Sequence, residues 1–121
     1  MKRILITDDE PMNLKMTEFV LKKNGYETIT ALSGPDCVNA VTSQGADLIL
    51  LDLFMPDMDG FETYERVRAT DAGKDIPVIL LTAAEDSETF DKAASCGIFA
   101  CVGKPFKQPE LLEKIKLALG E

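Results

Sequence analysis

Residues 47–52 read Asp-Leu-Ile-Leu-Leu-Asp, four apolar residues between two carboxylates. A continuous apolar run of this length is typical of a short strand that is buried on both faces of a sheet. Similar runs with branched side chains occur at intervals on either side of it. The sequence therefore predicts strands over residues 3–7, 27–31, 47–51, 78–81 and 100–102.

Stretches with helical spacing follow each of these strands. Pro11 suits the first turn of one helix, Ser33 caps the second and Gly60 opens the third. The fourth helix is predicted over residues 87–96, and the last one carries its apolar residues from position 111 onward. Five successive β-α units with buried central strands predict an α/β fold, in which helices cover both faces of one doubly wound parallel sheet.

Helix spacing also predicts which side chains share a helix face and, for the fourth helix, which of them point inward. Met16 and Val20 share one face of the first helix, and Phe90, Ala93 and Ala94 are expected to point inward from the fourth. The second strand alternates polar and apolar residues, which is typical of a strand at the edge of a sheet.

The length and composition are those of one soluble domain. The 121 residues contain no repeat or linker, so a single domain over residues 1–121 is expected. The net charge of −8 repels phosphate backbones and anionic lipids, which argues against a nucleic acid or a membrane as a direct partner. The apolar runs are also far too short to cross a bilayer.

The chain contains no histidine, which excludes His-ligated metals and Ser-His or Cys-His catalysis. Any phosphohistidine must therefore belong to a partner. Cys37, Cys96 and Cys101 form no C-x-x-C pair, and no secretory signal precedes them. We expect all three to be reduced core residues of a cytoplasmic protein.

Polar side chains follow four of the five predicted strands. Asp8 and Asp9 come after the first strand, Asp52 after the third, Thr82 after the fourth and Lys104 after the fifth. Because the carboxyl ends of parallel strands meet at one edge of the sheet, these groups should converge. Three converging carboxylates need a cation, and an all-oxygen ligand set favours Mg²⁺ over zinc. The hydroxyl and the ammonium group suit a phosphoryl group, with Asp52 as its acceptor.

Each of these residues has a simpler explanation when it is taken alone. Asp8, Asp9 and Thr82 can be helix caps, and Lys104 can be a solvated surface charge. Their coincidence at one edge favours a site over separate structural roles. The sequence has no glycine-rich phosphate-binding motif, so nucleotide binding is not predicted.

Four segments carry these residues: Ile-Leu-Ile-Thr-Asp-Asp-Glu-Pro at 4–11, Asp-Leu-Ile-Leu-Leu-Asp-Leu-Phe-Met-Pro-Asp-Met-Asp-Gly at 47–60, Pro-Val-Ile-Leu-Leu-Thr-Ala at 77–83, and Gly-Lys-Pro-Phe at 103–106. In this order they closely resemble the response regulator receiver domain, a CheY-like phosphoacceptor domain, and the resemblance spans nearly the whole chain. It implies a flavodoxin-like fold with strand order 2-1-3-4-5. It also implies a cis peptide bond between Lys104 and Pro105.

The resemblance further implies a role for each polar residue. A partner's phosphohistidine would phosphorylate Asp52, Lys104 would pair with the phosphoryl oxygens, and the Thr82 hydroxyl would move to bond one of them. The implied ligands of Mg²⁺ are the carboxylates of Asp9 and Asp52, the backbone carbonyl of Phe54, and Asp8 acting through water.

The sequence departs from the family pattern in two places. Cys101 occupies the position of the usual switching aromatic residue, and Phe99 lies two residues before it. Strand alternation favours Phe99 lying on the sheet beneath the flanking helices; the alternative is a partly exposed Phe99 in a partner or self-association surface. Phe54 and Ala84 flank the expected path of the attacking water and cannot orient it, which predicts slow hydrolysis of the phosphoryl group.

We therefore expect an independent receiver protein that acts as a phosphorylation switch in two-component or phosphorelay signalling. Its expected partners are a histidine kinase or histidine phosphotransfer protein and a downstream protein target, with a phosphorylation-dependent dimer as a further candidate. It is not predicted to be an enzyme beyond catalysing its own phosphorylation and dephosphorylation. A phosphohydrolase is disfavoured because Phe54 stands where those enzymes carry a second aspartate. The remaining alternative is a receiver-fold interaction module that acts without phosphorylation.

Overall fold

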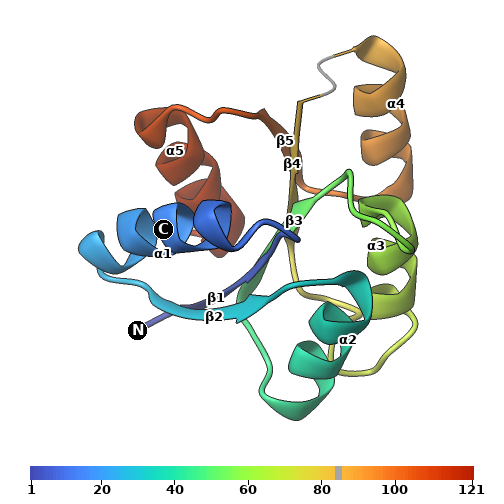
Figure 1. Ribbon diagram of the computed structural model, residues 1–121, viewed down its shortest axis with the longest axis horizontal. Coiled ribbons are helices and arrows are strands. Elements are labelled where there is room, and N and C mark those ends of the chain that lie inside the picture. The colour runs from blue at the N-terminus through green and yellow to red at the C-terminus, as the bar shows by residue number, and fades with distance from the viewer. Residues whose placement is uncertain (84–85) are drawn as a thin grey trace.

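The computed structural model describes residues 1–83 and 86–121. Within these ranges, five strands and five helices alternate along the chain (Figure 1). The strands are β1 (Arg3–Thr7), β2 (Glu27–Ala31), β3 (Leu48–Asp52), β4 (Val78–Thr82) and β5 (Ala100–Gly103). The helices are α1 (Pro11–Lys23), α2 (Gly34–Ser43), α3 (Gly60–Arg68), α4 (Ser87–Cys96) and α5 (Gln108–Leu119).

The strands form one sheet in the order β2-β1-β3-β4-β5, and neighbouring strands are parallel. This confirms the predicted α/β fold class and strand order. The register places Thr7 beside Leu51 and Leu81 beside Asp52. The carboxyl ends of β1, β3 and β4 therefore lie level at one edge of the sheet.

Helices cover both faces of the sheet: α1 and α5 lie on one face, and α2, α3 and α4 lie on the other (Figure 1). Successive side chains of β3 alternate between the two faces. Leu48 and Leu50 pack with α1 and α5, whereas Ile49 and Leu51 pack on the opposite side. All four are buried, as the apolar run at 47–52 predicts.

The predicted strand over 47–51 is displaced by one residue. Asp47 is exposed and precedes the strand, because its carboxylate accepts a hydrogen bond from the backbone N–H of Arg3 at 2.7 Å. The strand begins at Leu48 and ends at Asp52, so Asp52 is held within the sheet instead of following it.

The predicted helix starts are confirmed. Pro11 lies in the first turn of α1, and the Ser33 hydroxyl accepts a hydrogen bond from the backbone N–H of Asp36 at the start of α2. Gly60 opens α3, and α4 has the predicted bounds. None of the helices in the described ranges is long and apolar enough to cross a membrane.

The face of α1 that carries Met16 and Val20 is not its buried face. Its buried residues are Leu14, Thr17 and Leu21, whereas Met16 is 64% exposed and Val20 is half-buried. Helical spacing identifies stripes of apolar residues, but the position of the neighbouring helix decides which stripe is covered. Here the covered stripe includes a threonine.

The predicted inner face of α4 is partly wrong. Ala93 is buried, but Phe90 and Ala94 are exposed. All three cysteines are free, yet Cys96 at the end of α4 is exposed and is not a core residue. Phe99, just before β5, is 48% exposed, so the alternative of a partly exposed Phe99 is the correct one. These residues leave an apolar surface between α4 and β5.

Candidate functional site

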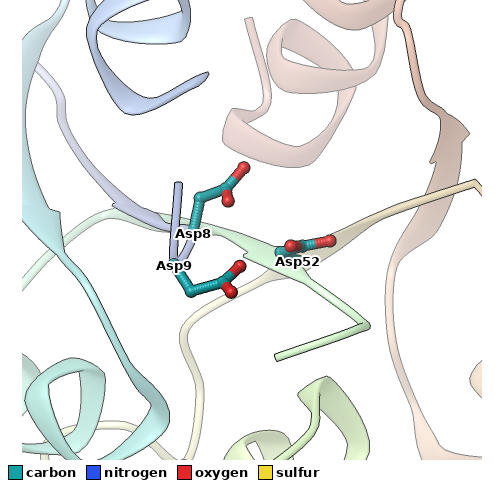
Figure 2. A group of neighbouring side chains, drawn as sticks. All are labelled: Asp8, Asp9 and Asp52. Carbon is teal, nitrogen blue, oxygen red and sulfur yellow. The ribbon is translucent and has the colours of Figure 1, made fainter. Parts of the chain in front are cut away.

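Three carboxylates meet at the carboxyl edge of the sheet. Asp8 and Asp9 follow β1, and Asp52 ends the adjacent strand β3. Each of them places one carboxylate oxygen within 4.8 Å of the others, and Figure 2 shows the three side chains pointing toward the same region. Asp8 and Asp52 are buried, and Asp9 is half-buried. The predicted convergence of these carboxylates is confirmed.

Lys104 also reaches this cluster. It directly follows β5, which is separated from β3 by β4 in the sheet. Its ammonium group lies 2.8 Å from Oδ2 of Asp8 and 3.4 Å from Oδ1 of Asp52. The lysine backbone is fixed because its N–H donates to the carbonyl of Thr82 at 2.9 Å. The peptide bond between Lys104 and Pro105 is cis, as expected.

Asp8 has two bonding partners, one for each carboxylate oxygen. Oδ1 accepts a hydrogen bond from the backbone N–H of Glu10 at 2.9 Å, and Oδ2 accepts one from Lys104. Asp8 is therefore not the cap of α1, because Glu10 holds the N-cap position and the helix has no side-chain cap hydrogen bond. Asp8 instead braces the turn before α1 and contributes charge to the site.

Burial raises the pKa of the Asp52 carboxyl from 3.8 to about 6. The Lys104 ammonium works against this rise, while the negative charges of Asp8 and Asp9 add to it. Burial of Lys104 by itself would lower the pKa of its ammonium group, but the hydrogen bond to Asp8 and the charge of Asp52 outweigh this effect and raise it. The single positive charge of Lys104 thus does not balance the three carboxylates of the cluster.

The cluster fits a hard divalent cation. Its ligands are carboxylate oxygens, without the thiolate or imidazole that zinc prefers. A cation with two positive charges would also offset the repulsion by Asp8 and Asp9, which adds to the effect of burial on the pKa of Asp52. An acidic pocket with few protein ligands suits Mg²⁺, which keeps several of its water molecules.

Thr82 lies on the strand next to Asp52, one residue after the register partner of Asp52, and Phe54 lies shortly after Asp52 in the chain. Thr82 ends β4, is fully buried and pairs in register with Gly103. Phe54 comes two residues after Asp52, and its side chain is 61% exposed. The proposed metal ligand at Phe54 is its backbone carbonyl and does not depend on that side chain. Ala84, the second residue expected near the attacking water, lies outside the described residues.

Gly60 supports the site in a way that the sequence analysis missed. A Cβ atom at this position would lie 2.7 Å from the carbonyl oxygen of Asp52 and 2.9 Å from Cα of Leu53. The Gly60 N–H also donates to the carbonyl of Leu53 at 2.8 Å. The absence of a side chain at Gly60 thus lets the start of α3 press directly against the end of β3. Asp59, whose carboxylate accepts from the N–H of Glu62, fixes the same turn.

These features define a class of protein: a doubly wound α/β domain with an acidic pocket at the carboxyl edge of its sheet. Comparison with known proteins gives the family. The family model of the response regulator receiver domain matches residues 4–116. The chain belongs to this family, and it is a receiver domain of two-component phosphotransfer signalling.

Two relatives differ in their total length. The chain is 35% identical to the DNA-binding response regulator MtrA of Mycolicibacterium smegmatis over 118 residues, which are 98% of this chain but only 50% of MtrA. It is 30% identical to the polar-differentiation response regulator DivK of Brucella anthropi over 120 residues, which are 99% of this chain and 98% of DivK. The chain thus spans half the length of one relative and nearly all of the other.

A solved structure also resembles the chain closely. The receiver domain of the sensor histidine kinase PA1611 from Pseudomonas aeruginosa superimposes with a TM-score of 0.90 at 29% identity, covering 99% of this chain and 98% of that one. That structure holds a magnesium ion in its active-site cleft. Receiver domains bind Mg²⁺ at their acidic pocket and are in general signalling domains without enzymatic activity on other substrates.

Proposed function

We propose that residues 1–121 act as one receiver domain in which Asp52 accepts a phosphoryl group from the phosphohistidine of a partner. One observation carries this proposal: the Asp52 carboxylate is only 6% exposed and lies between two further carboxylates and the ammonium group of Lys104. A purely structural aspartate would gain nothing from this position, because burial there disfavours its charged form.

In the transfer step, an oxygen of Asp52 forms a bond to phosphorus while the P–N bond to the donor's imidazole breaks. The departing ring nitrogen keeps the electron pair. Lys104, already 3.4 Å from Asp52, is placed to pair with the oxygens of the transferred group, and the Thr82 hydroxyl is proposed to move toward one of them.

Asp8, Asp9, Asp52 and the backbone carbonyl of Phe54 would hold Mg²⁺, with Asp8 acting through water. When bound, the ion neutralises the charge that develops on the phosphoryl oxygens. Catalysis by this chain is then limited to its own phosphorylation and dephosphorylation.

The exposed face of α1 is a docking surface for the phosphohistidine protein in this proposal. Met12, Met16 and Phe19 recur at intervals of three and four residues and are 59–71% exposed. Next to them, a pocket of about 180 Å³ is lined by both Met16 and Lys104, which makes the surface continuous with the site. Clustered methionine and aromatic side chains are suited to binding an apolar helix surface.

Labelling with acetyl phosphate and Mg²⁺, followed by intact mass measurement, tests the site. The wild type should gain one phosphate, and the Asp52→Asn variant should gain none. Asp75→Asn changes an exposed aspartate in the same way and should label normally. Equal labelling of wild type and Asp52→Asn would refute the assignment.

A protein donor tests the docking surface separately. Met16→Ala and Phe19→Ala should slow transfer from a phosphorylated histidine kinase or phosphotransfer protein while leaving labelling by acetyl phosphate unchanged.

A receiver-fold interaction module that acts without phosphorylation is not favoured by the family and site. We place the protein in the cytoplasm, which the three free cysteines support, and we expect phosphorylation to change its binding to a downstream protein or to a second copy.

A further inference from the structure

The exposed face of α1 is basic, although the chain as a whole is acidic. The net charge of the chain is −8, whereas α1 carries three lysines and one glutamate. Lys15, Lys22 and Lys23 share one surface groove with the exposed Phe19. Glu18 already pairs with Lys22 at 3.5 Å, so within the described residues the charges of Lys15 and Lys23 have no ion-pair partner. This basic face of α1 therefore combines an exposed aromatic ring with a local excess of positive charge.

A hollow of about 210 Å³ lies on the surface between α4 and β5. Its lining is apolar and includes Phe90, Ala94, Phe99 and Cys101. The two phenylalanines are 39% and 48% exposed, so the hollow is open to another molecule. A cavity of about 150 Å³ is enough to hold a benzene ring, and the hollow can therefore accept one aromatic side chain.

Carboxylates border this hollow on the side of α4. The part of α4 before Lys92 carries two of them, Glu88 and Asp91, and no basic residue. Both are exposed, and because they are three residues apart they lie on the same side of the helix, beside Phe90. The ammonium group of Lys92 is turned toward α3, where it lies 4.3 Å from the centre of an aromatic ring. The rim of the hollow is therefore acidic, and its charge is opposite to that of the basic face of α1.

The basic face and the hollow lie on opposite sides of the molecule. α1 covers one face of the sheet and α4 covers the other (Figure 1). When α1 of one copy lies against α4 of a second copy, the α1 surface of the second copy and the α4 surface of the first stay free. Such a head-to-tail contact does not close after two copies, in contrast to the interface of a symmetric dimer.

We propose that copies of this chain associate head to tail, with Phe19 of one copy in the hollow between α4 and β5 of the next. The net charge of −8 repels two copies in general, so an attractive contact has to bring unlike charges together. One helix against one hollow is at the small end of protein interfaces, and we expect weak association. The contact needs no phosphoryl group on Asp52, so its failure would leave the proposed function untouched. On any one copy, α1 holds either a second copy or the proposed phosphohistidine protein.

Analytical ultracentrifugation of the unphosphorylated protein over a range of concentrations tests the association. The average mass should rise with concentration and pass that of a dimer, because each added copy offers a free surface for the next. A mass that stops at the dimer would show a symmetric interface and overturn the proposal. A monomer at every concentration would overturn it as well.

Exchange of charges tests which surfaces meet. Lys15→Glu on α1 and Asp91→Lys on α4 should each weaken association about tenfold, because each change replaces an attraction by a repulsion. The double variant, in which the two charges are exchanged, should associate more tightly than either single variant. Lys74→Glu and Asp75→Lys change the net charge by the same amounts at exposed positions between α3 and β4, and they should associate like the wild type. An equal loss in these controls, or a double variant no tighter than the single ones, would overturn the proposed contact.

A mixture of two variants completes the test. Phe19→Ala removes the inserted ring and Phe90→Ala removes a wall of the hollow, so each variant alone should sediment close to the monomer. In an equimolar mixture, the intact α1 of Phe90→Ala can bind the intact hollow of Phe19→Ala, and the mass should rise to that of a pair and stop there. Two variants that had only lost their fold could not restore association in this way. A mixture that stays as monomeric as its components would overturn the proposal.

Discussion

Replacing Asp52 by asparagine should stabilise the protein in metal-free buffer. The fold holds the ionised carboxylate at a cost, because its pKa is about 6 in the folded protein against 3.8 ordinarily. Each unit of this difference corresponds to about 1.4 kcal/mol, so the cost reaches about 3 kcal/mol at pH 7.5. Asparagine keeps the shape and cannot ionise. Because the amide is itself partly desolvated, this value is an upper bound.

The dependence on pH provides the sharper test. The folded state binds the proton more tightly than the unfolded state, so this group makes the wild type less stable as the pH rises from about 4 to about 6. The advantage of Asp52→Asn should be small at pH 4, grow as the pH rises toward 6 and be nearly constant above pH 7.

Urea unfolding followed by circular dichroism in the presence of a chelator measures this difference. With the slope usual for a small domain, about 3 kcal/mol moves the midpoint by one molar or more. Asp75→Asn changes an exposed aspartate, so the difference in its free energy of unfolding from the wild type should not vary with pH. Mg²⁺ at a hundred times its Kd should stabilise the wild type by about 2.7 kcal/mol and Asp52→Asn by less. A wild type that is more stable than Asp52→Asn at pH 7.5 would refute the reasoning, as would a difference that does not grow with pH.

Three further outcomes are expected. The phosphorylated protein should lose its phosphate slowly, and Phe54→Asn combined with Ala84→Glu should hydrolyse faster when the loss is followed by mass; no change would contradict the role of these positions. Phe99→Ala should cost less than about 1.5 kcal/mol in urea unfolding because the ring is 48% exposed, yet it should weaken phosphorylation-dependent association by about 2 kcal/mol. Gly60→Ala should destabilise the protein by about 1–3 kcal/mol, because the added methyl meets backbone atoms; a stability equal to wild type would show that α3 can move away freely.

It could be predicted from the sequence that the polar side chains of the site come together, because the parallel arrangement of the strands requires it. Asp8, Asp9, Asp52 and Lys104 each follow or end a strand, and parallel strands present the same ends at one edge. The buried run at 48–51 could likewise be recognised, because a strand that is covered on both faces is typically a continuous run of apolar residues.

Side-chain exposure on the helices could not be predicted equally well. The spacing of Met16 and Phe90 is compatible with an inward orientation, but the placement of neighbouring helices leaves both exposed. The close approach of Gly60 to Asp52 also has no local sequence signal beyond a glycine at a helix start. Such contacts depend on how α3 packs against β3, which is a property of the whole fold.

The sheet separates the surfaces on which a donor and a target would act. The docking surface proposed for the phosphohistidine protein lies on α1, whereas α4 with its exposed Phe90 lies on the opposite face (Figure 1). Two proteins that bind these surfaces do not compete for the same residues. Under the proposed function, a target that binds through α4 would not need to wait for the donor to leave α1.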